Sequence, residues 1–238
     1  MTFKTTVVPL RDDNPAQGTP FVVYGIMGLN LAIFLAQIGL STPELSQFYD
    51  DWGLVPAQFT ASLRGRLDAP LREWITLLSS QFLHGGFFHL GGNLLYLWIF
   101  GNNIEDQLGH FKFLIFYLGC GVLAGLTQWV FDPLSTMPTV GASGAIAGVM
   151  GAYVLRFPRA QILTLLPLIV VFTTVRIPAI FFLGIWFAQQ ALFSLATLTD
   201  QVNLGSSGVA YWAHLGGFIF GLMLGPMLGL MKPHPPRR

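Results

Sequence analysis

The chain of 238 residues contains 53% hydrophobic and 10% charged residues, and its formal net charge at pH 7 is +1. Soluble globular domains carry about 25% charged residues, so this composition excludes an ordinary soluble protein and favours an integral membrane protein. The near-neutral charge gives no reason to expect nucleic acid or acidic partners. The single cysteine, Cys120, excludes an intrachain disulfide and is expected to serve only in packing.

Residues 1–20 are polar, contain prolines and lack the apolar region of a signal peptide. We expect them to form a cytoplasmic segment before one membrane domain, residues 21–231, with a basic cytoplasmic tail over residues 232–238. Six apolar runs in that domain approach the roughly 20 residues that a membrane-spanning helix needs. They cover residues 21–40, 87–107, 111–131, 141–157, 178–198 and 209–231.

Two further stretches lie between these runs. The long first outer loop, residues 41–86, contains aromatic pieces such as "WGLVPAQF", so we expect it to lie in the outer membrane interface, a depth that tryptophan favours. The alternative is a plain folded loop. Residues 160–175 are rich in β-branched side chains and are interrupted by Pro167. This stretch is too short for a confident span, and we expect an extended, interfacial or partly buried loop.

The distribution of basic residues supports this topology. With six spans and a cytoplasmic N-terminus, nine Lys and Arg residues fall on the inner side, while Arg64, Arg66 and Arg72 fall on the outer side. This asymmetry is the one that the positive-inside rule requires. The lack of an organelle-type presequence favours a prokaryotic plasma membrane.

Polar residues recur near the outer ends of the second, fourth and sixth spans, which all run from outside to inside. These residues are His89 and Asn93, Ser143, and His214. All fall within the first two turns, about 3–10 Å deep at 1.5 Å per residue. Glycines at three- and four-residue spacing accompany Ser143 and His214, and such stripes let membrane helices pack closely. We therefore expect the fourth and sixth spans to bring these two side chains together.

Each of these residues also has a structural interpretation. A serine in a glycine-rich helix is usually a packing residue, and His89 with Asn93 could be an interhelical hydrogen-bond pair. A histidine inside a span is costly, however, and is functional by default. The shared depth favours nucleophilic catalysis, with Ser143 as nucleophile and His214 as general base. No acidic residue lies at this depth, so we expect a dyad whose imidazole is oriented by packing.

An acyl-transfer site also needs donors for the oxyanion of the tetrahedral intermediate. Backbone N–H groups at the start of the helix that carries Ser143 have no intrahelical partner and suit an anion. The side chains of His89 and Asn93 can add donors from the second span. This arrangement needs no metal or cofactor.

Other chemistries fit the residues less well. Asp132 and Asp200 fall in short outer loops, so a membrane-embedded aspartate pair is missing, and no His-Glu-x-x-His motif occurs. A metal site formed by His84, His89 and His214 would have no carboxylate at its depth to act as a base. A small transporter or channel would need charged or inverted-repeat features near the midplane, and the sequence offers none.

The same residues resemble the rhomboid family of intramembrane serine proteases. Gly141-Ala142-Ser143-Gly144 is similar to the family's Gly-x-Ser-Gly motif, and Ala213-His214-x-x-Gly217-x-x-x-Gly221 to its histidine helix. His89-x-x-x-Asn93 resembles the oxyanion-binding pair, and Gly101-x-x-x-Glu105-x-x-x-Gly109 a motif near the inner end of the same span. The resemblance covers about residues 21–231.

This resemblance implies an all-α, six-transmembrane-helix rhomboid-like bundle that cleaves other membrane proteins in or beside their transmembrane segments, near the outer face. Its substrates and the lipid bilayer would be its partners, and no cofactor is implied. Residues 178–198 would form a lateral gate, and "TDQVNLGSSGV" a mobile cap. Many members have an aromatic residue four positions after the nucleophile, where this chain has Ala147. The alternative is a catalytically silent rhomboid-like protein that binds membrane clients, but such relatives typically lack the serine or the histidine.

Overall fold

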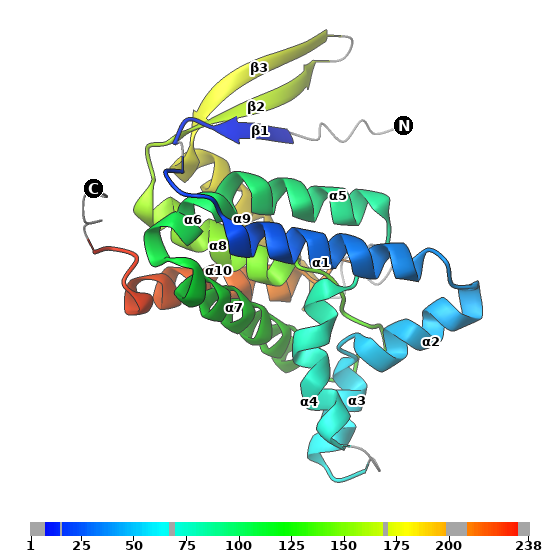
Figure 1. The fold of residues 1–238 in the computed structure, drawn as a ribbon. Coiled ribbons are helices and arrows are strands. Elements are labelled where there is room, and N and C mark those ends of the chain that lie inside the picture. The colour runs from blue at the N-terminus through cyan, green and yellow to red at the C-terminus, as the bar shows by residue number, and fades with distance from the viewer. Residues whose placement is uncertain (1–7, 15, 67–69, 169–170, 199–208, 233–238) are drawn as a thin grey trace.

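The computed structural model describes residues 8–14, 16–66, 70–168, 171–198 and 209–232 (Figure 1). The helices are α1 (Phe21–Gln37), α2 (Thr42–Trp52), α3 (Pro56–Leu63), α4 (Pro70–Ser79), the 3₁₀ turn η1 (Ser80–Phe82), α5 (Phe87–Tyr96), the π-turn η2 (Leu97–Gly101), α6 (Asn102–Leu108), α7 (His110–Phe131), α8 (Ser143–Arg156), α9 (Ala179–Thr197) and α10 (Tyr211–Leu228). The strands are β1 (Val8–Asp12), β2 (Gln161–Leu168) and β3 (Val171–Pro178).

Helices occupy all six of the predicted apolar runs, so the predicted helical membrane fold is confirmed. By length and hydropathy, α7, α9 and α10 are each able to cross a membrane, and α1 is a shorter apolar helix. The second run forms α5, η2 and α6 in unbroken succession, and the fourth forms α8. The positive φ of +78° at Gly109 turns the chain between α6 and α7 within a single residue.

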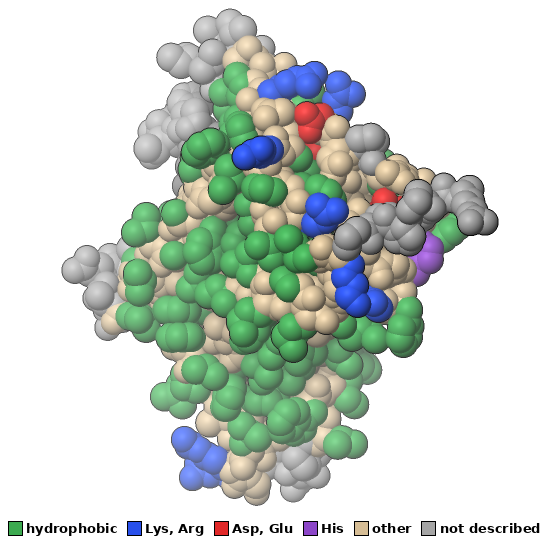
Figure 2. Space-filling view, turned by 90° about the vertical axis from the view of Figure 1, so that its left-hand side faces the viewer, with side chains coloured by type: hydrophobic (Ala, Val, Ile, Leu, Met, Phe, Trp, Pro, Cys, Tyr) green, Lys and Arg blue, Asp and Glu red, His purple; other side chains and the backbone are tan. Residues whose placement is uncertain are grey.

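The outer surface of the bundle is apolar. Figure 2 shows a broad field of hydrophobic side chains over the middle of one face, with most of the Lys and Arg side chains in view above it. Large side chains that are exposed on the helices include Leu29, Leu35, Phe111, Ile115, Ile185 and Leu192. A surface of this kind is stable only in lipid, because exposed apolar patches of this size are rare on soluble monomers.

The buried helix α8 is the centre of the bundle. Every residue from Gly144 to Tyr153 is buried, and Cys120 on the neighbouring α7 is buried as a free thiol, as predicted. With 14 residues, α8 is about 21 Å long, shorter than the roughly 30 Å of a bilayer core. The segment that precedes it is therefore drawn into the bundle, where the Gly141 N–H donates to the Ser80 carbonyl at 2.9 Å.

Helices α2, α3 and α4 form a layer at the end of the bundle opposite the β-sheet (Figure 1). They are built from residues 41–86, which the sequence places in the outer interface. Their own small core contains Leu54, Phe59 and Leu77. The Phe59 ring packs edge-on against Trp129 of α7 at 5.1 Å, and this contact fixes the layer to the bundle.

Residues 160–175 are extended and partly buried, as expected, but they form regular strands and not the expected loop. Strands β2 and β3 form an antiparallel hairpin there, and β1 adds to the other edge of β2, so that the order is β1–β2–β3. The β-branched composition of this stretch suits strands. The sheet is completed by residues 8–12, about 150 positions away in the sequence, and a local pattern cannot reveal such a partner. Ile162 and Thr164 of β2 are fully buried.

Asp12, at the end of β1, ties this sheet to the helices. Its carboxylate accepts hydrogen bonds from the Tyr153 hydroxyl at 2.5 Å and from the Asn103 side chain at 2.9 Å. These donors come from α8 and α6. Burial raises the pKa of Asp12 above its ordinary value of 3.8, although the hydrogen bond from Tyr153 opposes the rise.

Glu105 explains the Gly101-x-x-x-Glu105-x-x-x-Gly109 pattern. Its carboxylate is buried and accepts the backbone N–H groups of Val22 and Val23 at 2.9 and 2.8 Å. These two groups belong to the first turn of α1, where N–H groups have no intrahelical partner. A negative charge at a helix N-terminus is also favourable for the dipole. Glu105 therefore caps α1 from the inner end of α6.

The raised pKa of Asp12 predicts a pH-dependent stability. The folded state favours the protonated carboxyl of Asp12. Its contribution to the free energy of unfolding is therefore complete below about pH 4 and is lost as the pH rises through the folded-state pKa. Thermal unfolding in detergent should show the wild type losing stability relative to Asp12→Asn as the pH rises through this range.

Glu44 is the control, and its effect on stability should have the opposite pH dependence, because the Ser41 hydroxyl and N–H hold its pKa below 4.5. The wild type should lose stability relative to Glu44→Gln as the pH falls below about 4.5. Parallel curves for wild type and Asp12→Asn would contradict the prediction.

Candidate active site

Ser143 is the first residue of α8, and the local sequence explains its setting. Gly141 has a φ of +125°, a region that side chains rarely adopt. A Cβ atom there would also lie 2.6 Å from Nε2 of His89. Only glycine meets both conditions, so Gly141 lets the entering chain pass directly beside His89 and start α8 at Ser143.

The glycines of α8 and α10 interlock. A Cβ at Gly217 would lie 2.1 Å from the carbonyl oxygen of Gly144, and one at Gly221 would lie 2.0 Å from that of Gly148. In the other direction, a Cβ at Gly151 would lie 2.2 Å from the Phe218 carbonyl oxygen. The two backbones are therefore in direct contact, as small-residue stripes permit.

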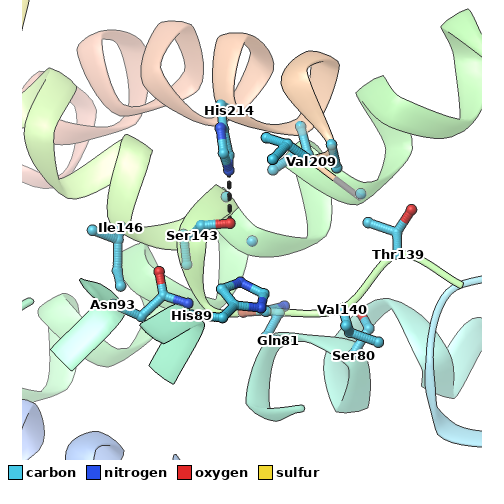
Figure 3. Close-up of a pocket in the computed structure, with 18 of the residues that line it drawn as sticks. Ser80, Gln81, His89, Asn93, Thr139, Val140, Ser143, Ile146, Val209 and His214 are labelled. Carbon is cyan, nitrogen blue, oxygen red and sulfur yellow. Dashed lines mark hydrogen bonds between the residues drawn. The ribbon is translucent and has the colours of Figure 1, made fainter. Parts of the chain in front are cut away.

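This packing brings the predicted nucleophile and base together. The Ser143 Oγ lies 2.8 Å from Nε2 of His214 (Figure 3). On the other side of the ring, Nδ1 lies 2.8 Å from Oε1 of Gln190 on α9. Because an amide oxygen only accepts, Nδ1 carries the hydrogen, and the lone pair of Nε2 is free to accept the Ser143 hydroxyl.

Helix α9 supplies two neighbours of His214 that the sequence reasoning missed. Gln190 is one, and the Trp186 ring, 5.8 Å from the imidazole at an interplanar angle of 36°, is the other. The expected orientation by packing alone was therefore incomplete. The pair of glutamines at positions 189 and 190 in a largely apolar span was the available signal. Ala147 has no room for an aromatic side chain, because it is fully buried facing Gly217.

His89 and Asn93 face Ser143 from the side opposite His214 (Figure 3). His89 Nδ1 accepts the Gly85 N–H at 3.2 Å, so its Nε2 carries the hydrogen in the neutral ring. The buried Nδ2 of Asn93 has no hydrogen-bond partner among the described residues. Buried donors without partners are rare and call for an explanation. Here both donors border a cavity.

That cavity has a volume of about 700 Å³ and is bordered by Ser143, His214, His89 and Asn93 together with η1 and the segment before α8. Irregular backbone at membrane depth is tolerated only where protein buries it or where it lines a water-filled space. The irregular segment before α8 thus meets this condition at the edge of the cavity, beside the serine. Of the predicted cap, residues 199–208 lie outside the described residues, and Val209 lines the cavity.

His84 does not join the site as a metal ligand. Its ring is fully buried and packs edge-on against His89, with 5.2 Å between the centroids. Among the residues that the structure describes, no three His, Cys, Asp or Glu side chains lie close enough to hold a metal ion.

Comparison with known proteins agrees with this geometry. Residues 71–230 match the Rhomboid domain. The chain is 31% identical over 209 residues to the mitochondrial Rhomboid protein 1 of Saccharomyces cerevisiae, covering 86% of this chain and 52% of that protein. It is 35% identical over 162 residues to the rhomboid protease GluP of Bacillus subtilis, covering 67% and 27%. The human presenilin-associated rhomboid-like protein is 30% identical over 149 residues, covering 61% and 36%. The chain thus spans about half of the yeast relative and less of the other two.

The interlocked glycines predict how sensitive the site is to helix spacing. Gly221→Ala should force α8 and α10 apart and lower the free energy of unfolding by about 1–3 kcal/mol, the usual cost of overpacking. Gly184→Ala on α9 is the matched control, because a Cβ there meets nothing within 4 Å. The control should be neutral or slightly stabilising. Thermal unfolding in detergent measures both, and an equal effect of the two substitutions would refute the close contact.

Proposed function

The chain belongs to the rhomboid family, and we propose that it is an intramembrane serine endopeptidase that hydrolyses peptide bonds in or next to the transmembrane segments of other membrane proteins. The observation that carries this proposal is the 2.8 Å hydrogen bond between Ser143 and His214 beside a cavity within an apolar bundle. The three relatives named above are longer than this chain, so the activity is proposed for its rhomboid domain.

In the proposed reaction, the Ser143 Oγ attacks the carbonyl carbon of the scissile bond while His214 Nε2 takes the hydroxyl proton. The C–N bond then breaks, and the same proton passes from Nε2 to the leaving amine. Water attacks the acyl ester next, giving its proton to Nε2, and the proton returns to Ser143 as the carboxylic acid leaves. No metal or cofactor takes part in this sequence.

The oxyanion of each tetrahedral intermediate would be held by donors that already face the cavity. These are the unpartnered Asn93 amide, the His89 Nε2–H and the first backbone N–H groups of α8. Donors fixed in place before the reaction act strongly in a site that largely excludes water. The helix dipole of α8 adds a further favourable field.

The proposed substrates follow from the surroundings of the serine. The bundle surface is apolar, so a client must reach Ser143 from the lipid as a membrane segment, and hydrolysis needs the water that the cavity admits. The location that we propose is a prokaryotic plasma membrane. The distribution of Lys and Arg supports a cytoplasmic N-terminus and an active site towards the outer face.

The alternative is a catalytically silent rhomboid-like protein that binds membrane clients. Such a protein has no need of a serine hydroxyl at hydrogen-bond distance from an imidazole, and this contact favours the protease. The alternative predicts that clients associate with the purified protein without being cut.

The direct test uses purified protein in detergent and a reporter substrate that contains one transmembrane segment. Wild type should cleave the reporter and react covalently with a fluorophosphonate, whereas Ser143→Ala should do neither, because the substitution removes the hydroxyl that is hydrogen-bonded to His214. Ser46→Ala, at an exposed position of α2, is the matched control and should behave as wild type. Cleavage by Ser143→Ala at the wild-type rate would overturn the proposal.

The oxyanion assignment has a separate test. Asn93→Ala should lower kcat by about 10²–10³-fold, the usual loss for one such donor, with a small change in KM. Asn102→Ala removes an amide near the other end of the same helical segment and serves as the control. Steady-state cleavage of the reporter measures both variants. An unchanged kcat for Asn93→Ala would remove this residue from the proposed mechanism.

A further inference from the structure

Helix α9 presents two side chains to His214 that the proposed dyad does not itself require. Gln190 is 7% exposed and Trp186 lies one turn before it, so both project from the same face of the helix. The rest of α9 is largely apolar, and the outward-facing Ile185 and Leu192 are 69% and 68% exposed. An inward-facing amide in such a helix is costly unless a partner satisfies it.

Resting on the proposed function, we propose that Gln190 is a positioning residue for the reaction, acting through Nδ1 of His214 as the acidic member of a triad does elsewhere. The amide oxygen lies 2.8 Å from Nδ1 and can only accept a hydrogen bond. It therefore selects the tautomer in which Nε2 has a lone pair directed at Ser143. The other tautomer would present an N–H to the Ser143 hydroxyl and could not take its proton.

A neutral amide suits this location better than a carboxylate would. A buried carboxylate inside the bilayer must be desolvated, and that cost rises steeply without a full set of hydrogen bonds. An amide oxygen gives the same directional preference at a much lower desolvation cost. Among the described helices, no acidic residue lies at the depth of His214. With Gln190 in this role, the dyad does not need one.

Trp186 completes the arrangement by fixing the plane of the ring. The centroid of its indole lies 5.8 Å from the centroid of the His214 imidazole and 6.2 Å from that of the Phe218 ring, one turn further along α10. This contact occupies the side of the histidine that α9 covers. Helix α9 thus supplies the aromatic neighbour that Ala147 does not provide.

The test measures inactivation by a fluorophosphonate, which needs only a nucleophilic serine and its base. Gln190→Met keeps the length of the side chain and removes the oxygen, so kinact should fall roughly 10- to 100-fold, part of the usual worth of a general base. KI should not change. Gln190→Glu retains an acceptor oxygen at a higher desolvation cost, so it should be less stable but should keep most of the wild-type kinact while it is folded. Gln189→Met is the matched control, because Gln189 is exposed on the same helix, and it should react as wild type.

Each outcome is decisive when the rates are measured well below the melting midpoint of every variant. Equal kinact values for wild type and Gln190→Met would overturn the positioning role and leave the protease proposal intact. An equal loss in a folded Gln190→Glu would also overturn it, because an acceptor would then not be what matters. Failure of the wild type itself to react would instead defeat the proposed function.

Discussion

Direct contact between the backbones of α8 and α10 is the constraint on which the site depends. Ser143 and His214 lie 71 positions apart in the chain, and side chains as short as serine can meet an imidazole only if their helices nearly touch. Gly151, Gly217 and Gly221 lack the Cβ atoms that would collide with the facing backbone. In lipid, close van der Waals packing of this kind is the main force that holds helices together. The same contact therefore serves stability and places the reactive pair.

The shortness of α8 has an equally direct effect. A central helix that does not reach the outer surface forces the chain before it to enter the bundle in irregular form. The backbone groups of that segment are satisfied by the outer layer, as when Leu54 and Thr139 pair through two backbone hydrogen bonds. The space left beside them is the cavity, so the polar surroundings of the serine follow from the length of one helix.

Much of this arrangement could be predicted from local patterns. Long apolar runs locate the helices, and glycine spacing with polar residues at one depth points to Ser143, His214, His89 and Asn93. The sheet could not be predicted because β1 pairs with β2, far away in the sequence, as where Asp12 lies opposite Ile162. Gln190 escaped notice for a different reason, since an isolated pair of glutamines in a span forms no repeating pattern. Its role became visible only when α9 was seen beside the ring of His214.

The small sheet also fixes how the chain is threaded. Strands β1 and β2 exchange backbone hydrogen bonds, so residues 8–12 and 161–168 must lie on the same side of the bilayer. An even number of crossings must then separate them. The four predicted crossings, which are α1, the segment from α5 to α6, α7 and α8, satisfy this requirement. Because β2 and β3 form a hairpin, the chain turns back at that surface and α9 must leave in the direction opposite to the arrival of α8. Strand pairing therefore restricts how the chain can insert into the membrane, independently of the distribution of Lys and Arg.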